Sequence, residues 1–177
     1  MSNCQSKTAE QKNILMVGDL LSRNLSASVV KNVTDMKFRW VEAATVEKED
    51  DRASFRETVE TELEREPVDT LVIQGGTEEV TNLDITGDVS SKMESMKKTI
   101  KTSSENLFNI AENSLENNSG LQRVVLLKRM FRCDINDPDG LKSKLSEYGN
   151  RVFEDTWLDR GCPKNIIIAQ QDLTSNA

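Results

Sequence analysis

Short, continuously apolar runs alternate with longer amphipathic segments along this chain, and no other feature restricts its fold as strongly. The apolar runs cover residues 14–17, 38–41, 68–74, 121–128 and 165–169. Between them, apolar side chains recur at helical spacing over residues 22–33, 50–66, 91–116 and 139–159. Strands that alternate with helices in this way predict an α/β domain built around a parallel sheet.

The runs ILMV, TLVI, VVLL and III have no alternating polar residues, which is typical of strands covered on both faces. Right-handed crossovers between such strands predict a three-layer α/β/α sandwich, with a five-stranded parallel sheet in the flavodoxin-like order 2-1-3-4-5. A length of 177 residues fits one domain. We therefore assign residues 13–170 to this α/β domain, residues 1–12 to a flexible N-terminal tail and residues 171–177 to a C-terminal tail.

The composition excludes several classes of chemistry. The chain has no histidine, 23 Lys and Arg residues, and 30 Asp and Glu residues. Without an imidazole, these residues cannot by themselves form a Ser-His-Asp or Cys-His catalytic site or a histidine metal site. The formal net charge of −7 disfavours nucleic acid and anionic membranes as partners, because both attract clustered Lys and Arg.

Targeting signals are also missing from the sequence pattern. The polar start MSNCQSKTAEQKN has no signal-peptide core, and no apolar run approaches the roughly 20 residues of a membrane span. Three widely spaced cysteines, Cys4, Cys133 and Cys162, form no CxxC motif, which predicts free thiols. We therefore expect a cytoplasmic protein that does not enter a membrane.

Residues 49–66 are unusually acidic, with eight Asp and Glu side chains against three arginines. On an amphipathic helix, a charge run of this kind is typical of a face that points into solvent. We predict that these charges form a solvated outer face rather than a recognition surface.

Two segments that follow predicted strands resemble motifs of the SGNH (GDSL-type) hydrolases. Residues 17–24 (VGDLLSRN) resemble the opening GDS-L-x-R-N motif of this family, and residues 75–83 (GGTEEVTNL) resemble its third block, GxND or GTNE. Residues 124–129 (VVLLKR) stand where the family has its next strand. The resemblance spans residues 13–170 and implies the same α/β fold.

The resemblance also marks the positions of the family's catalytic groups, and this chain departs from each of them. Leu20 replaces the nucleophilic serine, and Glu78 replaces the oxyanion-binding asparagine. No glycine lies between Gly18 and Gly75 to supply the second block, and no histidine follows the last strand. Leucine cannot attack a carbonyl, and a carboxylate at position 78 repels a developing oxyanion. The resemblance therefore implies a degenerate member of the family that is not an enzyme.

Further residues of the two motifs are candidates for the ligand crevice, namely Asp19, Ser22, Arg23, Gly76, Thr77 and Glu79. Ser22 could replace the missing nucleophile, but its place just before an apolar helical pattern favours a helix N-cap.

A metal site is a weaker possibility at the same place. Oxygen ligands for Mg²⁺ or Ca²⁺ could come from five carboxylates, Asp19, Glu78, Glu79, Asp84 and Asp88. Their spacing matches no EF-hand loop, so we expect no metal and no other cofactor.

The favoured functional hypothesis is a pseudo-hydrolase domain that acts as a binding or interaction module for a protein or small-molecule partner. An alternative is a fragment or divergent form of an SGNH esterase or acetyl-hydrolase. A third hypothesis is a nucleic-acid-associated module that uses lysines along one predicted helix, Lys92, Lys97, Lys98 and Lys101. Aromatic residues make up only 5% of the chain and are not interleaved with these lysines, which disfavours nucleic-acid binding.

Overall fold

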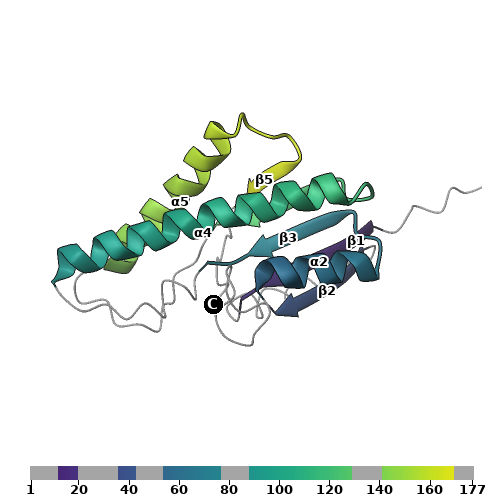
Figure 1. Ribbon diagram of the computed structural model, residues 1–177, viewed down its shortest axis with the longest axis horizontal. Helices are drawn as coiled ribbons and strands as arrows, with labels where there is room; N and C mark the ends of the chain where they lie inside the picture. Colours follow the sequence, from purple (N-terminus) through teal and green to yellow (C-terminus); the bar gives the residue numbers. More distant parts are fainter. Residues whose placement is uncertain (1–11, 20–35, 43–53, 77–87, 129–140, 170–177) are drawn as a thin grey trace, which may run out of the picture.

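A computed structural model describes residues 12–19, 36–42, 54–76, 88–128 and 141–169 of the chain. Figure 1 shows that strands and helices alternate from residue 36 onward. The strands are β1 (Lys12–Gly18), β2 (Met36–Glu42), β3 (Thr70–Gln74), β4 (Arg123–Leu127) and β5 (Ile166–Ala169). The helices are α2 (Phe55–Arg65), α4 (Val89–Asn117) and α5 (Leu141–Asp159). β1 begins at Lys12, the last residue of the expected N-terminal tail.

The strands are ordered β2-β1-β3-β4-β5, and every neighbouring pair is parallel. The α/β class and the parallel sheet predicted from the sequence are therefore confirmed. Each strand is within two residues of its predicted start, because strand boundaries are less sharply encoded than the apolar runs themselves.

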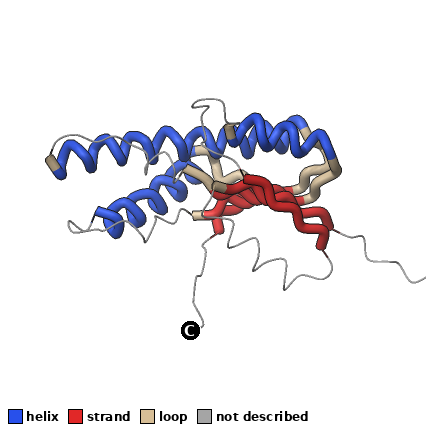
Figure 2. The backbone as a smooth tube through the Cα atoms, turned by 90° about the horizontal axis from the view of Figure 1, so that it is seen from below, coloured by secondary structure: helices blue, strands red, loops and turns tan. Residues whose placement is uncertain are grey.

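The three described helices lie on one face of the sheet, as Figure 2 shows. The connections from β2 to β3, from β3 to β4 and from β4 to β5 all cross the sheet in the same direction. Right-handed crossovers in one direction place their helices on the same face. The second helical layer of the predicted sandwich depends on residues 22–33, which lie outside the described residues, so that layer stays a prediction.

The main hydrophobic core lies between the sheet and these helices. Alternate strand residues supply one side of it: Leu15, Val17, Leu71, Ile73, Val124, Leu126 and Ile166. The helices supply the other side: Phe55, Val59, Leu107, Phe108, Ile110, Ala111 and Phe153. All of these side chains are buried, and the rings of Phe108 and Phe153 pack with their centroids 5.9 Å apart. The helical stripes predicted for α2 and α4 are therefore core positions.

Helix α4 is much longer than the strands that it covers. Its 29 residues span about 44 Å, whereas a seven-residue strand spans about 23 Å. In Figure 1 the N-terminal part of α4 extends past the sheet together with the start of α5. There, Ile100, Leu145 and Val152 form a second cluster with the partly buried Met93, Met96 and Tyr148. The single apolar stripe read from the sequence thus serves two separate clusters.

The edge strand β2 is joined to α2 by ion pairs. Arg39 and Arg65 both donate to the carboxylate of Glu62, whose side chain is only 8% exposed. Nearby, Lys37 donates to Glu66 at 2.6 Å, and this hydrogen bond and the ammonium charge lower the pKa of Glu66. The prediction of a solvated outer face is wrong for Glu62, because this carboxylate points toward the sheet edge rather than into water.

Candidate functional site at the carboxyl ends of the strands

The carboxyl ends of β1 and β3 meet side by side in the middle of the sheet. Gly18, the last residue of β1, pairs in register with Gln74, the last residue of β3. The backbone N–H of Asp19 donates to the carbonyl oxygen of Gln74 at 3.1 Å. These three residues and the following Gly75 and Gly76 are all buried, and we call the five residues the strand-end cluster.

The strand-end cluster lies at the topological switch point of the sheet. The chain moves from β1 to one side to form β2, and then crosses to the other side of β1 to form β3. In doubly wound folds, ligands bind just beyond the carboxyl ends of the strands at such a point. The cluster is therefore the best candidate site among the described residues.

The start of helix α2 is fixed against this cluster. Ser54 caps the helix, since its hydroxyl accepts a hydrogen bond from the backbone N–H of Glu57, and the Glu57 carboxylate accepts one from the backbone N–H of Ser54. The first helical residue, Phe55, is fully buried. A Cβ atom on Gly75 would lie 2.6 Å from Cζ of Phe55, so only glycine fits at this position. Gly75 therefore permits the close approach of α2 to the end of β3.

Gly76 leaves the strand with a φ of 85°, in the left-handed region that favours glycine. The apolar run over residues 68–74 predicted a strand that ends at residue 74, and β3 does stop at Gln74. The sequence pattern did not show that the two glycines have different roles, one in packing and one in backbone conformation.

Of the predicted crevice residues, the structure brings Asp19 and Gly76 to this edge. The others, Leu20, Ser22, Arg23, Thr77, Glu78 and Glu79, lie outside the described residues. Asp88, a candidate metal ligand, instead caps helix α4. Its carboxylate accepts a hydrogen bond from the backbone N–H of Ser91 at 2.8 Å, and this hydrogen bond lowers the pKa of Asp88. Within the described ranges, no three His, Cys, Asp or Glu residues lie close enough to hold a metal ion.

The sequence reading missed Gln74 as a site residue. Its side chain is fully buried, and neither Oε1 nor Nε2 has a hydrogen-bond partner among the residues that the structure describes. Buried polar groups are nearly always paired, so this amide is unusual. The available signal was an amide side chain that directly follows the apolar residues LVI at the end of the strand TLVIQ.

The basic residue at the end of β4 is already paired. The backbone N–H of Lys128 donates to the carbonyl of Ala169 at 2.8 Å, and its ammonium donates to Glu154 of α5 at 2.6 Å. Lys128 is therefore neutralised by Glu154.

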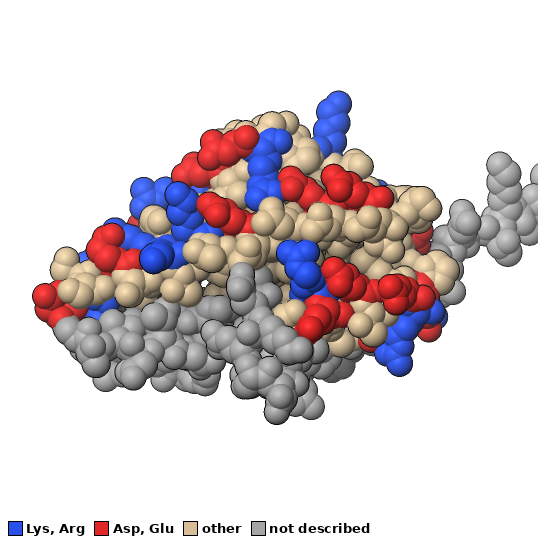
Figure 3. Space-filling view, viewed as in Figure 1, with Lys and Arg blue, Asp and Glu red and all other residues tan. Residues whose placement is uncertain are grey.

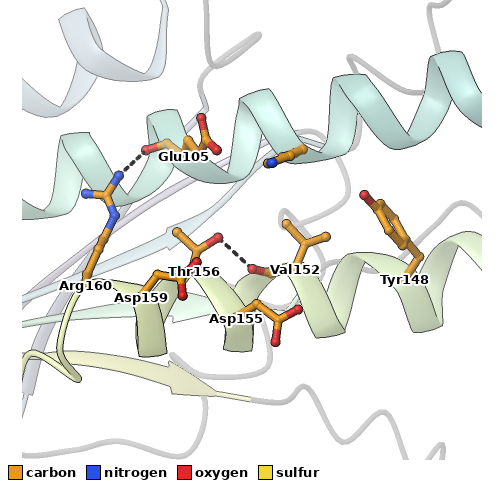
Figure 4. Close-up of a pocket in the computed structure, with 8 residues that line it drawn as sticks. Glu105, Tyr148, Val152, Asp155, Thr156, Asp159 and Arg160 are labelled. Carbon is orange, nitrogen blue, oxygen red and sulfur yellow. Dashed lines mark hydrogen bonds between the residues drawn. The ribbon is translucent and has the colours of Figure 1, made fainter.

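A separate groove of about 400 Å³ lies between α4 and α5, with buried Val152 among its lining residues (Figure 4). Arg160 lines one end, where it donates to Glu112, to Oδ1 of Asn109 at 2.9 Å and to the carbonyl of Glu105. The carboxylates of Glu105 and Asp155 point away from each other in Figure 4. The guanidinium of Arg160 is already paired with residues of α4, and the carboxylates of Glu105 and Asp155 point apart. The groove therefore offers no converging set of groups for a ligand.

The outer face of the helices carries charges of both signs. Figure 3 shows acidic and basic side chains interspersed over this face. Among the four lysines considered for nucleic-acid binding, Lys97 donates to Glu94 and lies 5.6 Å from the ring centroid of Tyr148. No described helix is both long and apolar enough to cross a membrane.

The sequence matches no known family model and no curated protein. The fold, however, is similar to that of a GDSL-like lipase from Bacteroides thetaiotaomicron, with a TM-score of 0.54 and 12% sequence identity over 90% of this chain and 68% of that chain. It is equally similar to Est24, a carbohydrate acetylesterase from Sinorhizobium meliloti, with a TM-score of 0.54 and 12% identity over 90% of this chain and 84% of that chain. At this identity the likeness concerns the fold alone, and it agrees with the SGNH-like fold implied by the two motifs.

Proposed function

We propose that this chain is a non-catalytic, SGNH-like domain that binds a ligand beyond the carboxyl ends of β1 and β3. The fold resembles that of a GDSL-like lipase and an acetylesterase, and the strand-end cluster lies where doubly wound folds bind their ligands. Binding and hydrolysis place different demands on this edge. Binding needs only a surface that fits, whereas hydrolysis also needs a nucleophile, a base and oxyanion donors.

The observation that carries the proposal is the position of Asp19. It follows the last residue of β1 and is joined by its backbone N–H to the end of β3, so the aspartate of the GDSL-like motif lies at the switch point. The next residue in the sequence is Leu20, where the resemblance expects the nucleophilic serine. A leucine side chain has no atom that can attack a carbonyl carbon, and the 177 residues contain no histidine to act as base.

A divergent esterase, or a fragment of one, is the second candidate, and the same structural likeness favours it. In this alternative a nearby hydroxyl such as that of Ser22 would replace the missing nucleophile. The proposed binding role and this alternative differ in one measurable property, the formation of a covalent or hydrolysed product.

We expect the purified protein to show no turnover of p-nitrophenyl acetate or of acetylated xylose above a protein-free blank. The Leu20→Ser variant should be equally inactive, because Glu78 still replaces the oxyanion-binding asparagine of the motif and the chain has no histidine to act as base. Loss of one good oxyanion donor alone lowers turnover by about 100- to 1,000-fold. Hydrolysis is followed by absorbance and by acetate release, and covalent chemistry by labelling with a fluorophosphonate probe.

An active acetylesterase such as Est24 serves as the positive control for both substrates. Labelling of the wild-type protein at Ser22, located by peptide mapping and abolished in Ser22→Ala, would contradict the proposal and establish the esterase alternative.

A further inference from the structure

Positive and negative side chains separate along helix α4, which lies between α2 and α5 in Figure 1. Its first half, residues 89–103, has four lysines and one glutamate. Its second half, residues 104–117, has three glutamates and no basic residue. The two halves of the helix therefore have opposite formal charges of equal size.

This distribution does not stabilise the helix itself. The helix macrodipole favours acidic side chains in the first turn and basic side chains in the last turn, and α4 has neither. Lys98, Lys101 and Glu116 also form no ion pair within the part of the chain that the structure describes. Charges that are unpaired within the chain are available to a second molecule.

The unpaired charges lie on the outer stripe of the helix. Lys98 and Glu116 are 18 residues apart in the sequence, which corresponds to about five turns and about 27 Å along one side of the helix. Both side chains are exposed, whereas Ile100 and Leu107 on the inner side are buried. When a second α4 lies antiparallel across this stripe, the order of its charges is reversed and each lysine-rich half faces a glutamate-rich half.

We propose that the outer face of α4 is a self-complementary dimer interface, on which α4 of a second copy of this chain packs antiparallel about a two-fold axis at the level of residue 107. Lys98 of each copy then faces Glu116 of the other copy, and Glu105 faces Asn109. The Oδ1 atom of Asn109 accepts a hydrogen bond from Arg160 of its own chain, which leaves its NH₂ group to donate to the Glu105 carboxylate. Each contact occurs twice in such an isologous interface.

A second copy matches this stripe better than other partners do. Nucleic acid or an anionic membrane would meet the glutamates of the second half as well as the lysines of the first, and the chain as a whole has a net charge of −7. An acidic peptide would match only the first half. A second α4 supplies both signs in reverse order at the same spacing. Because the contacts are between exposed charges, the dimer is weak and depends on the salt concentration. It does not depend on the ligand proposed above.

The test is sedimentation velocity of the full chain in about 50 mM NaCl, at protein concentrations from about 10 µM to about 1 mM. The wild type should shift from monomer to dimer over this range. In about 1 M NaCl it should stay monomeric, because charge interactions are then screened beyond about 3 Å. Lys98→Glu and Glu116→Lys should each raise the dissociation constant of the dimer at least about tenfold, since each substitution places two pairs of like charges across the interface.

An equimolar mixture of the two variants tests the antiparallel arrangement itself. Opposite charges then face each other again at both contacts, so the mixture should form a heterodimer as tightly as the wild type forms its homodimer. This recovery also shows that both variants are folded. Arg123→Glu is the matched control for the charge change, because Arg123 is exposed and its neighbour Val124 faces the helices, which places Arg123 on the opposite face of the sheet. This control should dimerise like the wild type.

A wild type that is monomeric at every concentration in low salt would overturn the proposal. A mixture of the two variants that stays monomeric would do the same, as would a dimer that neither substitution weakens. Retention of a monomeric wild type on heparin, lost in Lys98→Glu, would assign the lysines to a polyanion instead of a second copy.

Discussion

Replacing Phe55 with alanine is expected to lower the free energy of unfolding by about 3–5 kcal/mol, the usual cost of removing a fully buried aromatic ring. Phe55 is the first residue of α2, is 0% exposed and packs onto Gly75 at the end of β3. Removal of this ring therefore eliminates the contact that holds α2 against the strand-end cluster. Chemical denaturation of the wild type and Phe55→Ala measures the difference directly.

The same contact predicts the behaviour of Gly75. Gly75→Ala introduces a Cβ atom 2.6 Å from Cζ of Phe55, and overpacking of this kind costs about 1–3 kcal/mol. In the Phe55→Ala background the added methyl group has room, so Gly75→Ala should cost less there than in the wild type. Gly120→Ala is the control, because no atom lies within 4 Å of a Cβ built at Gly120. Equal costs of Gly75→Ala in the two backgrounds would show that the two residues are not coupled.

Glu62→Ala should destabilise the protein by about 2–3 kcal/mol, since it leaves the half-buried guanidinium of Arg39 without its carboxylate. The side chain of Glu62 is only 8% exposed and binds Arg65 as well as Arg39. The midpoint of urea unfolding is the measurement, and it should fall without a change in slope.

The neighbouring pair between Lys37 and Glu66 provides the control for this experiment. Both side chains are about half exposed, at 54% and 45%, and exposed ion pairs contribute little to stability. Glu66→Ala should leave the unfolding midpoint where it is in the wild type. If Glu62→Ala and Glu66→Ala behave alike, burial of the Glu62 carboxylate has no energetic consequence and the interpretation of the β2–α2 junction is wrong.

Much of the fold could be read from the sequence, because it is encoded by local apolar periodicity. Runs such as TLVI predicted strands in a parallel sheet, and the helical spacing of apolar residues over 50–66 predicted α2, in which Phe55 and Val59 are buried. The two strand-end motifs also led to an SGNH-like fold, with which the structural likeness agrees. These inferences succeed because burial on a helix or strand follows its repeat, whatever the rest of the chain does.

Three features of the structure could not be read in this way. Glu62 belongs to an acidic run, Gly75 to a glycine pair and Gln74 to the end of a strand, and each has an ordinary local explanation. Their actual roles depend on residues distant in the sequence: Arg39 for Glu62, Phe55 for Gly75, and Gly18 and Leu127 for Gln74.

The sequence by itself determined the class of the fold, the alternation of its elements and the residue types present for chemistry, including the absence of histidine. Only the tertiary structure decided which charges are buried, which glycine is required by packing and which amide lacks a partner among the described residues. The physical reason is that apolar periodicity is a property of neighbouring residues, whereas desolvation and steric fit depend on every atom that surrounds a side chain in the folded state.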